Sequence, residues 1–263
     1  MSNSSGIDIA SAAAFLLAAE DAKRTCDQLT KRWPEMTVDE AYAVQAEALR
    51  MRVARGEKLI GIKLGLTSKA KQVQMKVGSP STAWLTDKLQ ISEGVIPSGA
   101  VANPRVEPEI VVTMRKRLQG PGATAADVID ALGDVRCGIE ILDSRYENFK
   151  FTLQDVVADN ASSGRFVLGK SVIAASQIDL VKEACVLKID GQQVAAATGE
   201  AVMGHPAEAI AWAANFLADR GQAIEAGWII MTGGMTDAYP IKPGAQVTAE
   251  FTRLGTVSIK RGE

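Results

Sequence analysis

The sequence predicts an α+β fold, in which a rolled mixed β-sheet follows an N-terminal helical hairpin. Apolar residues recur at helical spacing in the first 56 residues. Short apolar strands, separated by glycine and proline, then alternate irregularly with helices. This pattern is neither a regular βαβ repeat nor a pure sandwich. We therefore expect a helical segment over residues 1–56 and a mixed β-roll domain over residues 57–263, packed as one compact unit.

Two helices form the predicted hairpin. The first is amphipathic and covers residues 8–32, and Trp33-Pro34 ends it. The second begins after Thr37, because Thr37 and Glu40 have the spacing of a capping box. Gly56 suits the end of this second helix, where a left-handed residue is common.

The remaining chain contains predicted strands with two further helices between them. Asp190-Gly191 separates two β-like runs and is typical of a tight hairpin turn. Strands are predicted at 58–64, 109–115, 135–142, 165–168, 184–190, 228–232, 246–251 and 256–260, and helices at 125–132 and 206–218.

Composition excludes several classes of function. The 263 residues include 29 Lys+Arg and 31 Asp+Glu, for a net charge of −2, so no excess of positive charge favours nucleic acid or an anionic membrane. The Ala-rich stretch at residues 10–19 is too short to span a bilayer, and no signal-peptide pattern accompanies it. The cysteines Cys26, Cys137 and Cys185 are far apart and odd in number. We therefore expect a cytoplasmic protein.

His205 is the only histidine in the sequence. A mechanism that needs two imidazoles, or a metal site built from several, is therefore excluded. His205 precedes Pro206 at a predicted helix start, where we expect a structural or capping role. A serine nucleophile is not favoured either, because the segment 160–164 lacks the G-x-S-x-G pattern.

Three glutamates form the most informative pattern. Glu107 and Glu109 are two residues apart, so on a strand they project from one face, with backbone positions about 6–7 Å apart. Glu140 lies between isoleucines in a second strand, where an unpaired buried carboxylate is costly. Three such carboxylates would suit Mg²⁺ or Mn²⁺. The alternative is a solvated acidic face, with Glu140 paired to Arg145 or Lys63.

Lys63 lies inside the apolar run 60–66, where a lysine needs a carboxylate or an anionic ligand nearby. Gly61 and Gly65 flank it and permit close approach of backbone or ligand. Thr67-Ser68 then begins a polar turn or short helix whose free amides could receive an anion. A purely structural Lys–Glu pair remains the alternative.

Five short motifs occur in a fixed order along the chain. They are Gly61-Ile62-Lys63-Leu64-Gly65-Leu66-Thr67-Ser68, Pro104-Arg105-Val106-Glu107-Pro108-Glu109, Ile139-Glu140-Ile141-Leu142-Asp143-Ser144-Arg145, Val157-Ala158-Asp159-Asn160-Ala161-Ser162-Ser163 and Thr232-Gly233-Gly234. Together they resemble the 2-oxopent-4-enoate hydratase and 4-oxalocrotonate decarboxylase family, within the fumarylacetoacetase superfamily. The resemblance covers nearly the whole chain.

The resemblance implies a divalent metal, usually Mg²⁺ with Mn²⁺ as an alternative, and no organic cofactor. The implied metal ligands are Glu107, Glu109 and Glu140. The implied catalytic residues are Lys63 and Asp87, and the implied substrate-binding residues are Leu66, Ser162, Ser163 and Thr232. Lys76 and Ala83 occupy positions where the family has glycines, in a loop expected to close over the pocket.

The segment 146–151 resembles the decarboxylase branch of the family. The implied reaction is decarboxylation of 2-oxohex-3-enedioate in the catechol meta-cleavage route. Electrons from the breaking bond pass through the alkene to the ketone oxygen, where a metal and Lys63 would stabilise the charge. Arg165 or Lys170 is a candidate for holding the leaving carboxylate.

Three alternatives are open. The chain could be the hydratase with the same metal site, or a non-catalytic partner subunit of that hydratase. An acylpyruvate hydrolase with a His–Glu pair is disfavoured by the single histidine. The expected small-molecule partner is an oxo-dicarboxylate, and both a complex with the hydratase and a homo-oligomer are open.

Overall fold

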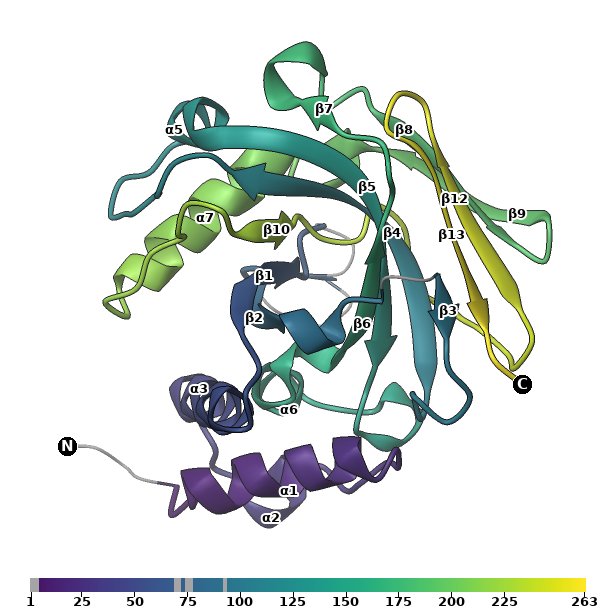
Figure 1. The fold of residues 1–263 in the computed structure, drawn as a ribbon. Coiled ribbons are helices and arrows are strands. Elements are labelled where there is room, and N and C mark those ends of the chain that lie inside the picture. The colour runs from purple at the N-terminus through teal and green to yellow at the C-terminus, as the bar shows by residue number, and fades with distance from the viewer. Residues whose placement is uncertain (1–4, 69–71, 74–77, 92–93) are drawn as a thin grey trace.

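The computed structural model describes residues 5–68, 72–73, 78–91 and 94–263. Two sheets and six labelled helices make up this part of the chain (Figure 1). The helices are α1 (Ile9–Asp21), α2 (Leu29–Arg32), α3 (Val38–Ala54), α5 (Ala125–Ala131), α6 (Leu153–Ala158) and α7 (Pro206–Ala218). The strands are β1 (Leu59–Gly65), β2 (Ser81–Thr86), β3 (Val95–Ile96), β4 (Pro104–Met114), β5 (Leu132–Asp143), β6 (Ser163–Leu168), β7 (Ile173–Ala174), β8 (Ala184–Ile189), β9 (Gln192–Thr198), β10 (Ile229–Met231), β11 (Tyr239–Pro240), β12 (Gln246–Phe251) and β13 (Gly255–Arg261).

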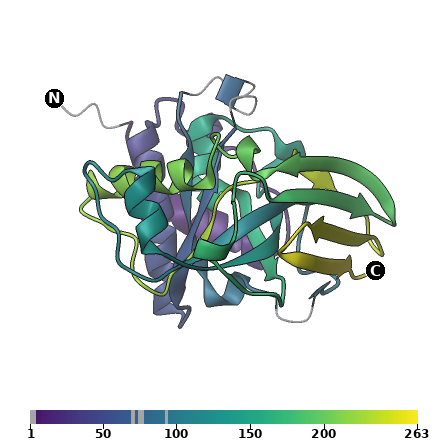
Figure 2. The same cartoon turned by 90° about the horizontal axis from the view of Figure 1, so that it is seen from above.

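The larger sheet has the strand order β2-β1-β10-β4-β5-β6, with β11 on β4 and β7 on β5. Only the β1–β10 pair is parallel among its pairs in the described residues, so the sheet is mixed. The smaller sheet has the order β3-β13-β12-β8-β9. Seen from above, it lies on one side of the molecule, with α5 and α7 on the other (Figure 2). The predicted α+β roll is confirmed.

The first predicted helix, over residues 8–32, was wrong in its extent. α1 ends at Asp21, and Lys23 follows with a φ of 51°. The backbone amide of Cys26 then donates to the carbonyl of Arg145 at 2.7 Å. This long-range pairing takes an amide that a continuous helix needs, so only the short α2 forms beyond it.

Elements with strong local signals agree with the sequence. α3 begins with the predicted Thr37–Glu40 capping box, and Gly56 follows its end with a φ of 95°. His205 caps α7, since its Nδ1 accepts from the amide of Ala207 at 2.9 Å, which confirms its capping role. Asp190 and Gly191 turn between β8 and β9 with positive φ, as predicted.

β2 was missed, and this changes the interpretation of Ala83. Every residue of β2 is buried, so its sequence lacks the alternation that marks a half-exposed strand. Ala83 is part of β2 and pairs with Lys63, rather than belonging to a loop over the pocket. Lys76, named with it, lies outside the described residues.

Two hydrophobic clusters position the site. The larger one fills the space between the two sheets and under α7, and includes Ile110, Ile139 and Ile210. The other joins α1 and α3 to Tyr146 and Val157 from the β-roll part. Within the described residues, no helix has both the length and the apolar character needed to cross a bilayer. The boundary at residue 56 stays a prediction.

Candidate metal centre and active site

The pairing of β4 with β5 brings the three glutamates together. Glu107 lies directly opposite Glu140, and Glu109 is two residues further along the same face of β4. All three are buried. One carboxylate oxygen from each lies within 4.8 Å of the others. This is a carboxylate cluster of the size that one small cation can bridge.

Burial and mutual repulsion act on the carboxylates of this cluster. Burial, with the nearby charges of Glu140 and Glu107, raises the pKa of Glu109 well above its ordinary value. Burial also raises the pKa of Glu140, although the Lys63 ammonium acts in the opposite direction. Among the described residues, Glu109 Oε1 and Glu140 Oε2 are buried without a hydrogen-bond partner. Hard anionic oxygens without a donor fit a divalent cation such as Mg²⁺.

Lys63 is the positive group beside this cluster. Its Nζ lies 2.6 Å from Glu140 Oε1 and donates to the carbonyl of Ala161 at 2.6 Å. The side chain is buried. An ammonium carries three N–H donors, and the contacts of Lys63 within the described part of the chain use two of them.

A cavity of about 450 Å³ opens beside Lys63 and the cluster. Its wall combines charged groups with an apolar surface. The lining residues are Lys63, Gly65, Leu66, Ser81, Arg105, Glu107, Leu142, Phe149, Phe151, Val156, Ala161, Ser162, Asp237 and Ala238.

Four of the nine site residues predicted from the sequence line this cavity. Lys63, Leu66, Glu107 and Ser162 line it, and Ser162 Oγ is buried without a hydrogen-bond partner among the described residues. Ser163 is the next residue along the chain; its hydroxyl is also buried without a partner there, but it does not line the cavity.

Asp87 and Thr232 do not lie in the wall. Asp87 follows the far end of β2, about four residues or 13 Å along the strand from Ala83, the partner of Lys63. Its carboxylate accepts from the amide of Lys58 at 2.8 Å, which fixes the start of β1. The Thr232 hydroxyl donates to the carbonyl of Ile110 at 2.9 Å, so its donor is already used.

The glycines after Thr232 contact the metal centre instead. The amide of Gly233 donates to Glu109 Oε2 at 2.9 Å. A Cβ on Gly234 would lie 2.0 Å from Glu107 Oε2, so only glycine lets the backbone approach this carboxylate. The segment holds the ligands in place from the side opposite β5.

Sequence reasoning missed Arg105 as a lining residue. Its guanidinium lies 4.1 Å from the centre of the Phe149 ring, and among the described residues it forms no ion pair. It precedes Glu107 by two residues on the same strand face, a signal present in the sequence. Arg165 and Lys170 do not line the cavity: Arg165 donates to its neighbour Gly164 at 2.7 Å, and Lys170 is exposed.

Comparisons with known proteins agree with this geometry. Residues 58–260 match the fumarylacetoacetate (FAA) hydrolase C-terminal family. The chain is 42% identical to 4-oxalocrotonate decarboxylase of Pseudomonas putida over 89% of each chain. It is 40% identical to 2-hydroxyhexa-2,4-dienoate hydratase of Comamonas testosteroni, over 90% of this chain and 91% of the relative. A solved structure, 4-oxalocrotonate decarboxylase from Pseudomonas putida G7 complexed with magnesium and adipate, aligns with a TM-score of 0.94 and 41% identity, covering 96% of this chain and 97% of that one.

Proposed function

The chain belongs to the fumarylacetoacetate hydrolase family, and on this premise we propose that it is a metal-dependent decarboxylase of 2-oxohex-3-enedioate (4-oxalocrotonate) in catechol meta-cleavage. It is a carboxy-lyase that releases CO₂ and forms 2-hydroxypenta-2,4-dienoate. One observation carries the proposal: a buried triad of carboxylates lies beside Lys63, next to a cavity that Lys63, Arg105 and Glu107 line.

Glu107, Glu109 and Glu140 would hold the metal, Mg²⁺ or Mn²⁺, through their carboxylate oxygens. Two of these oxygens, Glu109 Oε1 and Glu140 Oε2, have no hydrogen-bond partner among the described residues. When bound, the ion supplies Lewis acidity toward the 2-oxo group and its neighbouring carboxylate. The related decarboxylase of known structure binds magnesium, which supports this assignment. No organic cofactor is required, because the conjugated ketone accepts the electrons.

In the reaction the C5–C6 bond breaks and CO₂ leaves. The electron pair of that bond forms the C4–C5 double bond, the alkene pair moves to C2–C3, and the ketone oxygen gains negative charge. This dienolate takes up one proton from solvent on oxygen to give 2-hydroxypenta-2,4-dienoate, the enol form of 2-oxopent-4-enoate. Lys63 places an ammonium beside this oxygen, to which it can donate a hydrogen bond. The Ser162 hydroxyl supplies a further donor in the wall for a substrate carboxylate.

Arg105 is the group suited to the distal carboxylate. It lies about 6–7 Å along β4 from Glu107, close to the length of roughly 6 Å of a chain of five C–C bonds. The magnesium complex of the related decarboxylase contains adipate, a six-carbon dicarboxylate. A six-carbon diacid whose 2-oxo acid end binds at the metal centre can therefore reach Arg105 with its distal carboxylate.

The apolar part of the wall favours loss of the carboxylate as neutral CO₂. Leu142, Phe149, Phe151 and Val156 line the cavity together with Arg105, which lies over the Phe149 ring. A charged carboxylate is poorly solvated there, whereas CO₂ is not penalised.

A hydratase is the second candidate, because a 40% identical relative carries that activity and the metal triad suits it equally. The two activities differ in substrate charge: the hydratase substrate has one carboxylate and leaves Arg105 without an anion. A non-catalytic partner subunit is disfavoured, since a scaffold has no need for buried, mutually repelling carboxylates.

The experiment supplies 2-oxohex-3-enedioate with Mg²⁺ to the full chain and measures CO₂ and product. We expect stoichiometric CO₂ that EDTA abolishes and added Mg²⁺ restores. Release of CO₂ after complete metal removal would contradict the metal-dependent mechanism. Water addition to 2-hydroxypenta-2,4-dienoate, without CO₂ from the diacid, would assign the hydratase activity instead.

We also propose a cytoplasmic location, consistent with three cysteines that form no disulfide. Assembly into a homo-oligomer, or with the pathway hydratase, is part of the same proposal. Light scattering on the purified chain, alone and mixed with that hydratase, measures both.

A further inference from the structure

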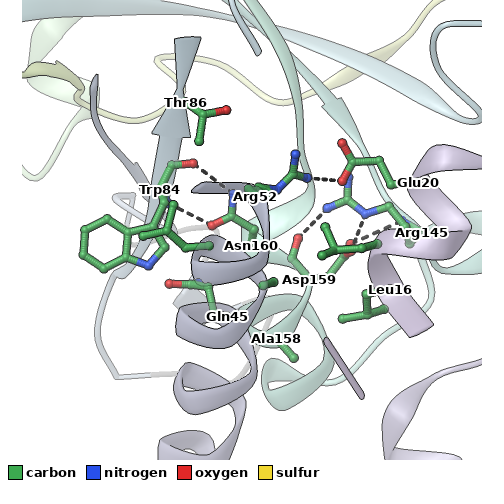
Figure 3. A pocket seen from close by; sticks show the side chains of 13 residues that line it. Leu16, Glu20, Gln45, Arg52, Trp84, Thr86, Arg145, Ala158, Asp159 and Asn160 are labelled. Atoms are coloured by element: carbon green, nitrogen blue, oxygen red, sulfur yellow. Dashed lines mark hydrogen bonds and ion pairs between the residues drawn. The ribbon is translucent and has the colours of Figure 1, made fainter. Parts of the chain in front are cut away.

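A second cavity, of about 20 Å³, lies where α1 and α3 meet the segment between α6 and β6. Buried charged side chains line it, and Figure 3 shows Arg145 reaching toward Asp159 while Arg52 reaches Glu20. Arg145 Nε donates to Asp159 Oδ1, and the amide of Arg145 donates to Asp159 Oδ2 at 3.2 Å. The pair is almost wholly buried.

Arg145 also binds the backbone on both sides of a short loop. Its Nη2 donates to the carbonyl of Asp159, and its Nη1 donates to the carbonyl of Ser163 at 2.8 Å. The three residues between these carbonyls are Asn160, Ala161 and Ser162. One guanidinium therefore fixes both ends of the loop.

This loop has an unusual conformation. Asn160, Ala161 and Ser162 have φ angles of 50°, 49° and 58°, in the left-handed region. Each non-glycine residue there costs roughly 1–2 kcal/mol, so surrounding contacts must hold the segment. The Asn160 side chain adds hydrogen bonds to the backbone of Trp84 on β2 at 2.8 and 2.9 Å.

The loop supplies two groups to the larger cavity, the one beside Lys63 and the three glutamates. The carbonyl of Ala161 accepts from Lys63 Nζ at 2.6 Å and so fixes the ammonium beside Glu140. The buried Ser162 hydroxyl, without a hydrogen-bond partner in the described part of the chain, lines the cavity wall. A small shift of the loop would move both groups together.

We propose that Arg145 is a positioning residue for the reaction: by binding the carbonyls of Asp159 and Ser163, it holds the left-handed loop that presents Ala161 to Lys63 and Ser162 to the substrate. This inference rests on the proposed function, because it concerns the same cavity. Arg145 lines the small cavity but not the larger one that would hold the substrate, so it acts there only through the loop.

The test is Arg145→Lys in the full chain. Lysine keeps a positive charge beside Asp159 but lacks the planar guanidinium, whose two terminal nitrogens bind the carbonyls of Asp159 and Ser163. We expect kcat to fall about 10- to 100-fold, because an ångström-scale shift of the reacting groups has this effect. Mg²⁺ affinity should stay within about threefold of wild type, since the ligands lie on β4 and β5.

Arg52→Lys is the matched control. Arg52 is similarly buried, pairs with Glu20 and Glu57, and lines the same small cavity. Among the described residues it forms no hydrogen bond or ion pair with the loop. The Arg52→Lys variant should lose stability to a degree comparable to Arg145→Lys and keep the wild-type kcat. An equal fall of kcat in both variants would show that Arg145 is merely structural.

A substrate-independent measurement separates this inference from the proposed function. The amide of Ser162 donates to the carbonyl of Asp159 at 3.0 Å, so Arg145→Lys should accelerate its hydrogen exchange, whereas Arg52→Lys should not. The wild-type chain is first assayed with the diacid and the dienoate, and the variants are compared on the reaction it catalyses. Failure of diacid turnover then leaves the loop result intact.

If Arg145→Lys does not fold, the double variant Arg145→Met with Asp159→Leu replaces the pair by apolar side chains, which is often tolerated in a core. We expect a folded protein with intact Mg²⁺ binding and a similarly reduced kcat. A folded single or double variant with wild-type kcat and unchanged exchange of Ser162 would overturn the proposal.

Discussion

At the residue scale, Lys63 and Glu140 form the ion pair that the sequence offered as a structural explanation. This pairing does not compete with metal binding. A carboxylate has two oxygens, and Glu140 Oε2 remains buried without a hydrogen-bond partner among the described residues. One oxygen fixes the lysine and the other is available to a cation.

Glu109→Gln tests the metal centre directly. The amide keeps the shape and can still accept from Gly233, but removes one of three anionic ligands. We expect Mg²⁺ affinity to fall at least about 100-fold and turnover to fall with it. Isothermal titration with Mg²⁺ measures this.

The control is Glu183→Gln, which changes an equally buried carboxylate far along the chain from the cluster. It should titrate with Mg²⁺ like wild type. An unchanged titration in Glu109→Gln would remove Glu109 from the ligands.

Arg105→Gln tests recognition of the distal carboxylate. That carboxylate loses its charge in the transition state, so Arg105 stabilises the bound diacid more than the transition state. We expect KM for the diacid to rise about 10- to 100-fold, the worth of a charged hydrogen bond, with no fall in kcat. Steady-state kinetics measure both, and Arg136→Gln on the neighbouring strand is the control. A lowered kcat at unchanged KM would contradict the assignment.

At the scale of elements, the register of β4 against β5 builds the centre, because it sets Glu107 opposite Glu140. A slip of one residue would turn the acidic side chains to the opposite face of the sheet. β10 pairs with the other edge of β4, and the glycines that follow it contact the carboxylates of the metal centre from that side.

Gly234→Ala tests this close approach. The added methyl group would overlap Glu107 Oε2, and the carboxylate must move away to accommodate it. We expect Mg²⁺ affinity to fall at least about tenfold, as for other changes that misorient a metal ligand. Titration gives the affinity, and the melting temperature in EDTA shows whether the fold persists. Wild-type affinity in a folded variant would mean that Glu107 has room to move.

At the scale of the whole molecule, metal binding and stability are coupled through the buried carboxylates. Burial raises the pKa of Glu109, so the folded metal-free protein binds a proton that the unfolded chain releases at lower pH. Its contribution to stability is present at low pH and is lost as pH rises through the raised pKa.

We therefore predict that, in EDTA, the melting temperature falls as pH rises from about 5 to about 8, more steeply than in saturating Mg²⁺. The bound cation favours the ionised form and removes this part of the slope. Thermal melts at each pH, with and without metal, measure it. Glu109→Gln should flatten the slope in EDTA; parallel slopes with and without Mg²⁺ in wild type would contradict the coupling.

Much of the fold could be predicted because its signals are local. The capping box of α3, the turn at Asp190-Gly191 and the start of α7 at His205-Pro206 each depend on a few neighbouring residues. β2 lacked such a signal because all its residues are buried. The helix predicted over 8–32 ended at Asp21, and beyond it the Cys26 amide bonds to the distant Arg145 carbonyl.

The sequence by itself determined the types of group in the site: three acids on two strands and one lysine in an apolar run, together with too few histidines for other chemistries. Tertiary structure alone decided which of them meet. In the folded chain Arg105 and Ser162 line the same cavity. Asp87 instead lies at the far end of a strand, and the Thr232 hydroxyl donates to the backbone of β4. The reason is physical. The chemistry of a side chain depends on its own residue type, whereas the distance between two side chains depends on strand register and on packing between segments far apart in the chain.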